Sequence, residues 1–131
     1  MRDKQEVFRL RLDEAPIKEL RGERGISASL IGPYVSGTTS IDLHRNILRP
    51  HSGPGPRHFH KQAENIYWVQ EGSIEVRLDN RTVTLGPDEI LLIPPGVVHG
   101  TSNPGESEAK FIEIYIPAGD DFHIVEDDTV S

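Results

Sequence analysis

The sequence predicts an all-β protein, folded as a sandwich or a small barrel. Short segments alternate apolar and polar side chains and are rich in β-branched and aromatic residues. Turn residues separate these segments at regular intervals, and no segment keeps the apolar period of a helix. This combination is typical of sandwiches and barrels. A barrel built from strands of this length has room inside for one small ligand.

The N-terminal part of the chain is the least regular. Residues 7–12 alternate imperfectly and predict an edge strand, which we expect to pair with a partner subunit because unpaired edges promote association. Residues 13–25 are charged and irregular, and residues 26–31 predict a strand that ends at Gly32-Pro33.

Residues 39–48 predict a strand whose inward face the sequence does not decide. One parity holds apolar side chains and the other is mostly polar: Ile41, Leu43 and Ile47 against Asp42, His44, Asn46 and Leu48. Residues 50–56 are dense in proline and glycine and therefore predict a loop.

The remaining strands follow from alternation and composition. They are predicted at residues 65–70, 73–78, 82–85, 90–93, 99–102 and 109–116. We expect a single domain over residues 1–131, with a core of about 39–117, an N-terminal extension at 1–38 and an acidic tail at 118–131 that frays from Gly119.

Composition excludes several classes of function. The 131 residues include no cysteine, so disulfides and thiolate metal sites are excluded. The net charge of -7 disfavours nucleic acids and anionic membranes as partners. No apolar run has the length of a signal peptide or a membrane span, and we expect a cytoplasmic protein.

A group of imidazoles and a carboxylate predicts a metal site. His58 and His60 are two residues apart and face the same way on a strand, Glu64 follows, and His99 comes directly after a Pro-Pro-Gly turn. This ligand set suits one divalent transition metal, Fe, Mn, Ni, Zn or Cu, without choosing among them.

The segment around these histidines is locally cationic. Residues 43–63 contain no acidic side chain but include Arg45, Arg49, Arg57 and Lys61. In an acidic protein, a cationic segment beside a metal favours a small anionic ligand, such as a carboxylate. The alternative is that strand parity sends these arginines outward into water.

The chain resembles the cupin superfamily, in particular its small single-domain members with a double-stranded β-helix, or jelly-roll, fold. The first motif of that family, G-x5-H-x-H-x3,4-E-x6-G, matches His58, His60, Glu64 and Gly72. The second, G-x5-P-x-G-x2-H-x3-N, matches Pro94, Gly96, His99 and Asn103. We expect Asn103 to tie down the loop after His99.

Three positions depart from these motifs. Ser52 and Asp88 stand where the motifs open with glycine. Seven residues rather than six separate Glu64 from Gly72, so that counting back from Gly72 places Asn65 at the carboxylate position. Glu64 is the favoured ligand because its distance from His60 is one the family allows, and Asn65 is the alternative.

The resemblance implies a metal-dependent enzyme, dioxygenase-like or lyase- or isomerase-like, acting on a small anionic organic molecule. His58, His60, Glu64 and His99 would hold the ion. Arg57 or Arg45 would orient an anionic group, and Tyr67 or Tyr115 would donate a proton.

Two alternatives remain: a non-catalytic module that binds or senses a small molecule, and a metal-free isomerase that uses a histidine as base. The fold by itself does not choose among these activities. The family resemblance also implies a homodimer.

Overall fold

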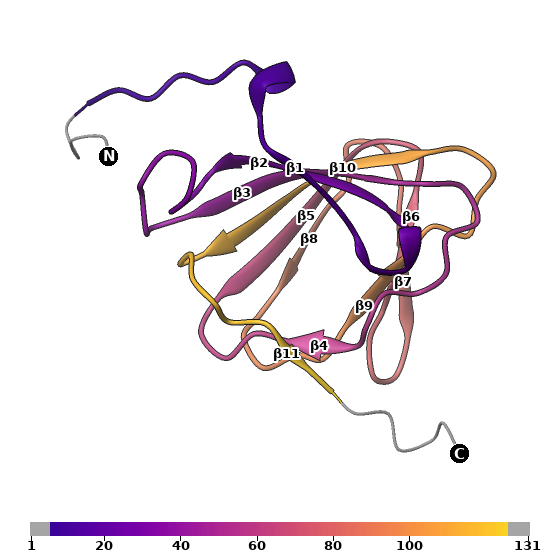
Figure 1. The fold of residues 1–131 in the computed structure, drawn as a ribbon. Helices are drawn as coiled ribbons and strands as arrows, with labels where there is room; N and C mark the ends of the chain where they lie inside the picture. Colours follow the sequence, from indigo (N-terminus) through magenta and orange to yellow (C-terminus); the bar gives the residue numbers. More distant parts are fainter. Residues whose placement is uncertain (1–5, 126–131) are drawn as a thin grey trace.

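The structure of the protein is a computed structural model, and residues 6–125 are the part described here. Its strands form two layers that face each other (Figure 1). One layer is a six-stranded sheet in the order β1 (Ile17–Glu19), β2 (Gly25–Ile31), β3 (Asp42–Leu48), β10 (Ala109–Ile116), β5 (Glu64–Glu71) and β8 (Ile90–Ile93). The predicted jelly-roll fold is confirmed.

The opposite layer is built from two smaller sheets. One has the order β7 (Thr82–Leu85), β6 (Ile74–Arg77) and β9 (Gly100–Ser102), and the other pairs β11 (His123–Ile124) with β4 (His58–Phe59). An isolated bridge between His58 and His99 links β4 to the segment that leads into β9. Two short 3-10 helices, η1 (Leu12–Glu14) and η2 (Arg21–Glu23), flank β1.

The N-terminal segment differs from its prediction. The edge strand expected at residues 7–12 is not formed; residues 7–11 run without regular structure, and the segment extends away from the two layers (Figure 1). Backbone groups form a strand only beside a partner strand, and this segment lies beside none of the described strands. By contrast, β1 and β2 extend the large sheet through the pairing of β2 with β3.

The C-terminal segment is also part of the fold. β11 pairs with β4 in the register His123↔Phe59 and Ile124↔His58. The carboxylate of Asp121 accepts hydrogen bonds from the backbone N–H groups of Lys61, Gln62 and Ala63, at 2.8 to 3.0 Å. Residues 118–125, here called the strap, therefore close one side of the barrel instead of fraying.

The large sheet has a polar inner face, which decides the parity that the sequence left open. Rows of cross-strand neighbours run across β3, β10 and β5: His44, Glu113 and Tyr67 in one row, and Asp42, Tyr115 and Asn65 in the next. The outer face carries apolar side chains, among them Trp68, Ile90 and Leu92. A sheet with a polar inner face encloses a cavity rather than a continuous core.

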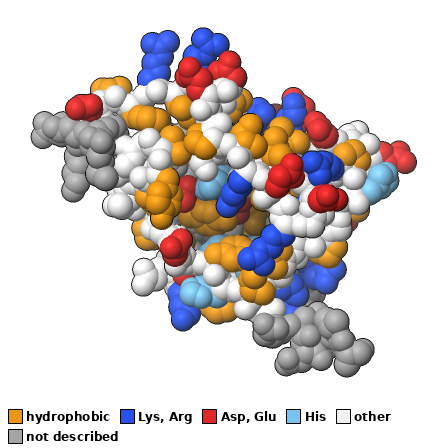
Figure 2. Space-filling view, viewed as in Figure 1, with side chains coloured by type: hydrophobic (Ala, Val, Ile, Leu, Met, Phe, Trp, Pro, Cys, Tyr) orange, Lys and Arg blue, Asp and Glu red, His pale blue; other side chains and the backbone are white. Residues whose placement is uncertain are grey.

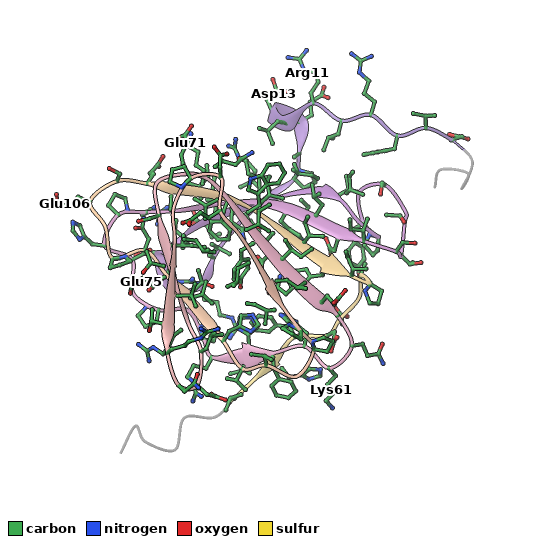
Figure 3. All side chains as sticks on the ribbon, turned by 180° about the vertical axis from the view of Figure 1, so that it is seen from behind. Arg11, Asp13, Lys61, Glu71, Glu75 and Glu106 are labelled. Atoms are coloured by element: carbon green, nitrogen blue, oxygen red, sulfur yellow. The ribbon has the colours of Figure 1, made fainter. Side chains whose placement is uncertain are left out.

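The hydrophobic core lies between the two layers, around Leu48, Val69, Ile74, Val76 and Ile93. Gly72 joins β5 to β6 with a φ of +72°, and a Cβ there would lie 2.3 Å from the carbonyl oxygen of Glu108. Only glycine therefore fits this turn. Charged side chains such as Lys61, Glu71 and Glu106 point outward (Figure 3).

Within residues 6–125, the structure has no helix of the length and apolar character that crossing a membrane requires.

Candidate metal centre and its cavity

Three histidines meet inside the barrel, as the motif predicts. His58 and His99 are held side by side by two backbone hydrogen bonds, of 2.9 and 2.8 Å, and His60 follows at the end of β4. All three side chains are buried, and one ligand atom of each lies within 4.8 Å of the other two. No other group of this kind is found in the part of the chain that the structure describes.

Hydrogen bonds to backbone carbonyls fix which nitrogen of each ring carries the proton. The Nδ1 atoms of His58, His60 and His99 lie 2.9, 2.6 and 2.9 Å from the carbonyl oxygens of Pro56, Asp121 and Val97. A carbonyl only accepts, so each Nδ1 donates, and each Nε2 of a neutral ring keeps a free lone pair. The Nε2 atoms of His58 and His60 are buried without a hydrogen-bond partner.

Burial also keeps the rings of His58 and His99 neutral. Desolvation lowers the pKa of His58 to about 3, with smaller contributions from the neighbouring His99, His60 and Arg24. It lowers the pKa of His99 in the same way. Neutral imidazoles are the protonation state that binds a metal.

Asn65, not Glu64, faces the histidines. Glu64 is exposed, whereas Asn65 is fully buried. The pairing of β5 with β10 is regular from Glu64 to Val69, and its one irregularity falls between Lys110 and Phe111. Without a bulge at Glu64, strand alternation turns this side chain outward and Asn65 inward. The expectation that the Glu64 carboxylate joins the cluster is therefore not met.

The contact between Asn65 and His99 brings two acceptors together. Asn65 Nδ2 points to Glu113 Oε2 at 3.3 Å and to the Ile114 carbonyl at 3.1 Å, which fixes the amide with Oδ1 toward His99. Oδ1 lies 3.1 Å from His99 Nε2, which has no proton to donate when Nδ1 bonds Val97. A cation between these lone pairs would satisfy both. The residues present thus fit a divalent transition metal, with three imidazole nitrogens and one amide oxygen.

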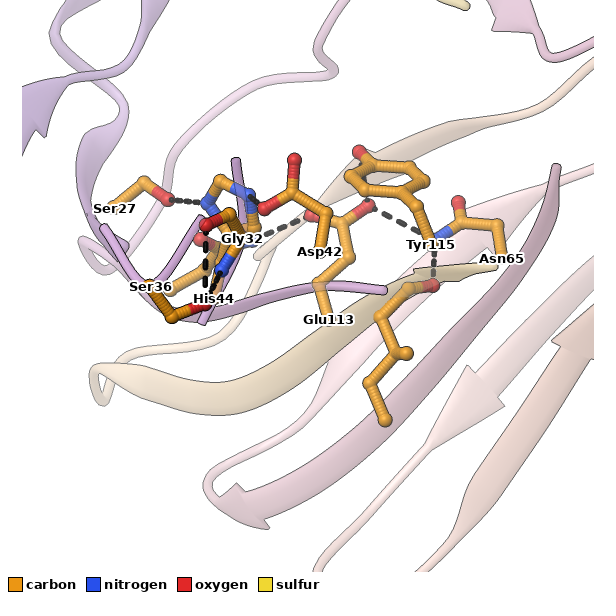
Figure 4. Close-up of polar contacts among 10 residues, drawn as sticks. Ser27, Gly32, Ser36, Asp42, His44, Asn65, Glu113 and Tyr115 are labelled. Carbon is orange, nitrogen blue, oxygen red and sulfur yellow. Dashed lines mark hydrogen bonds and ion pairs between the residues drawn. The ribbon is translucent and has the colours of Figure 1, made fainter. Parts of the chain in front are cut away.

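Glu113 is a buried carboxylate that no sequence motif pointed to. It lies on β10, and its neighbours are shown in Figure 4. Asn46 Nδ2 donates to Oε1 at 2.7 Å, and Tyr115 OH donates to Oε2 at 2.8 Å. The sequence signal for Glu113 is an acidic side chain in the middle of a mostly apolar strand.

A cavity of about 530 Å³ leads to the histidines. Figure 2 shows this face hollowed, with hydrophobic and histidine side chains visible inside the opening. Aromatic and aliphatic side chains line the cavity together with Glu113, Asn46 and the half-buried Arg24. The Arg24 guanidinium donates to the carbonyls of Gly53 and Thr101, at 3.3 and 3.1 Å.

The arginines expected at the site lie elsewhere. Arg57 pairs with Asp79 at 3.1 Å and does not line this cavity. Arg45 has the outward parity of β3 and borders a separate surface groove. Arg24, which lies in the segment predicted to be irregular, is the arginine that lines the cavity beside the histidines.

Both tyrosines named from the sequence line the cavity. Tyr115 packs edge-on against His60, with ring centroids 4.9 Å apart, and Tyr67 accepts a hydrogen bond from Thr101 Oγ1 at 3.2 Å. Burial, reinforced by the Glu113 carboxylate, raises the pKa of each phenol well above its usual value. Both hydroxyls are therefore protonated at neutral pH.

A second polar group lines the cavity on β2 and β3. His44 Nε2 lies 2.6 Å from Asp42 Oδ1, and its Nδ1 lies 3.2 Å from Ser27 Oγ (Figure 4). Because the carboxylate accepts from Nε2, Nδ1 keeps a lone pair toward the Ser27 hydroxyl. A lone histidine in the sequence gives no sign of this arrangement, which depends on two strands pairing.

Fold and site together define a small β-barrel protein with a histidine cluster inside. The chain belongs to the cupin family: the Cupin domain model matches residues 45–115.

One relative is the polyketide synthase CurC from Streptomyces cyaneus, which is 34% identical over 104 residues. The match covers 77% of this chain and 65% of CurC, so this chain spans less than two thirds of the length of CurC. Protein SchB from Streptomyces halstedii is 33% identical over 76% of this chain and 70% of the relative. Among solved structures, the polyketide cyclase RemF from Streptomyces resistomycificus superimposes with a TM-score of 0.79 at 23% identity, covering 95% of this chain and 89% of RemF. That likeness concerns the fold.

Proposed function

We propose that this protein is a metal-dependent enzyme that cyclises a polyketide-type substrate, a chain bearing several β-related carbonyl groups. The observation that carries the proposal is the buried cluster of His58, His60 and His99. The Nε2 atoms of His58 and His60 have no hydrogen-bond partner, and both of these residues line the cavity. CurC is a polyketide synthase and RemF is a polyketide cyclase, and these two similar proteins suggest the substrate class.

The proposed ligands are the Nε2 atoms of His58, His60 and His99 and the Oδ1 of Asn65. A divalent transition metal bound there would act as a Lewis acid toward a substrate carbonyl. A cavity of about 530 Å³ falls within the size range of small-molecule pockets.

Cyclisation by carbon–carbon bond formation needs a base and an acid, and the second polar group can serve as both. In the proposed step, His44 Nδ1 takes a proton from the carbon between two carbonyls, relayed by the Ser27 hydroxyl, and the C–H electron pair becomes the enolate. That carbon attacks a further carbonyl, and the oxygen formed there receives the proton back. Asp42 accepts from His44 Nε2 throughout and stabilises the imidazolium.

Other side chains would bind and orient the substrate. Arg24 is the half-buried cation beside the cavity and would hold an anionic group, a role that the sequence analysis gave to Arg57 or Arg45. Tyr67, held protonated by burial, would donate a hydrogen bond to a carbonyl oxygen of the substrate. The Tyr115 hydroxyl already donates to Glu113, so Tyr115 would help to shape the cavity instead.

The test begins with metal analysis of protein purified without a His-tag. About one transition metal per chain is expected, with loss of the metal in His60→Ala. His51→Asn is the matched control, because His51 is exposed and adopts a left-handed backbone that asparagine tolerates.

Activity is then measured on synthetic poly-β-ketone thioesters by mass spectrometry. A cyclised product with loss of water supports the proposal. Oxygen uptake without cyclisation would identify a dioxygenase instead, and a thermal shift without any turnover would identify a binding module; either result overturns the cyclase assignment.

A further inference from the structure

We propose that Glu113 supplies the negative charge that the four-ligand set lacks, acting as a positioning residue one step behind Asn65. This inference rests on the metal site of the proposed function, but not on the cyclisation reaction. The sequence analysis expected a carboxylate ligand at Glu64. In this proposal the Glu113 carboxylate takes its place and acts on the metal indirectly, through the Asn65 amide.

The first support is the geometry around the Glu113 carboxylate. Oε1 accepts from Asn46 Nδ2 at 2.7 Å, and Oε2 accepts from Asn65 Nδ2 at 3.3 Å and from Tyr115 OH at 2.8 Å. Asn46 lies on β3 and Asn65 on β5, on either side of β10. Each of these contacts comes from a donor, so the group is placed to accept as an ionised carboxylate.

The second support is that no counter-ion contacts the Glu113 carboxylate. Glu113 is only 9% exposed, and none of the salt bridges among the described residues includes it, although Arg24 attracts it without forming an ion pair. A buried charge without a contacting counter-ion is costly. A dication held by three neutral imidazoles and a neutral amide has the complementary problem, because its ligands bring no negative charge. The two charges therefore stabilise each other across Asn65.

The Asn65 amide connects the two charges. Its Nδ2–H donates to the carboxylate while its Oδ1 faces His99 Nε2 at 3.1 Å. A carboxylate at the N–H side polarises the amide and increases the negative charge on its oxygen, and it also prevents the amide from flipping. Without Glu113, Asn65 would be a weaker and less well oriented ligand.

The test uses metal binding alone, with Zn²⁺ as the probe in isothermal titration of the metal-free full chain and Co²⁺ absorption as a report on the ligand set. Glu113→Gln keeps the size of the side chain and removes its charge. It is expected to weaken Zn²⁺ binding about 10- to 100-fold, the usual effect of losing a residue that orients a ligand. Glu64→Gln is the matched control, since Glu64 is the exposed neighbour of Asn65, and its Zn²⁺ affinity should equal that of the wild type.

A double variant separates a charge effect from a structural one. Asn65→Glu combined with Glu113→Gln moves the carboxylate from behind the amide into the ligand set. It is expected to regain Zn²⁺ affinity to within a few-fold of the wild type, with a changed Co²⁺ spectrum. A purely structural role of Glu113 would leave the double variant as weak as the single one, and that result overturns the inference.

Wild-type affinity in a folded Glu113→Gln variant also overturns it. If that variant does not fold, the double variant decides alone. If His60→Ala abolishes Zn²⁺ binding while the Glu113 variants bind normally, the metal site stands and only this inference fails. If the Glu113 variants behave as expected but no polyketone is cyclised, the proposed reaction fails and this inference stands.

Discussion

The phenyl ring of Phe122 stacks on the imidazole of His58, with ring centroids 4.1 Å apart and planes inclined by 24°. Asp121, the residue before Phe122, accepts a hydrogen bond from His60 Nδ1 at its backbone carbonyl, at 2.6 Å. The strap thus supports two of the three clustered histidines, although it lies far from them in the sequence.

Phe122→Ala should therefore reduce the metal affinity of the histidine cluster more than it reduces the stability of the fold. Because the side chain is 46% exposed, we expect a loss of only about 1 kcal/mol in unfolding free energy, measured by urea denaturation. Zn²⁺ affinity should fall several-fold, because the His58 ring loses its stacking partner. Phe59→Ala is the control: Phe59 stacks on His123 at 5.2 Å, outside the cluster, and its loss should leave Zn²⁺ affinity unchanged.

The low pKa of His58 predicts the pH dependence of the metal-free protein. Burial lowers this pKa from 6.5 to about 3, so the unfolded chain binds a proton between these values and the native chain does not. The contribution of His58 to stability is therefore present above pH 6.5 and decreases as the pH falls toward 3.

Nitrogen-15 NMR of the imidazoles measures the protonation state of His58 directly. At pH 5, below the ordinary pKa of histidine, His58 should still give the signals of a neutral ring with the proton on Nδ1. A charged His58 ring at that pH would contradict the assignment.

Asn103 is predicted to matter for stability but not for metal binding. Its Nδ2 lies within hydrogen-bond distance of the carbonyls of Leu48, Arg49 and Ser107, and its Oδ1 accepts from the backbone of Gly105. Asn103→Ala removes these partners from buried backbone groups and should cost about 2–3 kcal/mol in denaturant unfolding. The folded fraction should bind Zn²⁺ with unchanged stoichiometry, and a lower stoichiometry would show that the loop also shapes the site.

The outer face of the large sheet predicts self-association. Trp68, Ile90 and Leu92 are 42, 61 and 52% exposed, and cross-strand pairs Trp68↔Ile90 and Ile66↔Leu92 make the surface continuous. Contiguous apolar surface of this kind marks an interface, and we expect a second copy of this chain to cover it.

Light scattering should therefore give the mass of a dimer for the wild type and of a monomer for a Trp68→Glu, Leu92→Glu variant. Thr84→Glu, exposed on β7, is the control and should remain dimeric. A monomeric wild type would exclude this interface.

Much of the fold could be predicted because its signals are local. Alternation and strand-forming composition identified β5, β6, β7 and β10 within a few residues, and Gly72 marked a turn that only glycine fits. The histidine cluster was also predictable, since His58 and His60 share a strand face and His99 follows a rigid turn. The N-terminal segment was not, because a strand depends on a neighbour that the sequence cannot show.

The remaining site residues depend on contacts between strands. Ser27, His44 and Glu113 carry no motif, and they meet only because β2, β3 and β10 pair in one register. Arg24 lies in an irregular segment and reaches the cavity through the carbonyls of Gly53 and Thr101. Arg57 was a reasonable sequence candidate, but its partner Asp79 holds it outside.

The sequence alone determined that this chain forms a β-barrel with three imidazoles on its inside, because side-chain alternation and turn chemistry act over a few residues. Only the tertiary structure decided between Glu64 and Asn65, since the two differ by one residue and a single bulge would have exchanged their faces. It also decided where the carboxylate lies, because Glu113 approaches Asn65 through the pairing of β5 with β10, although the two residues are 48 positions apart in the chain.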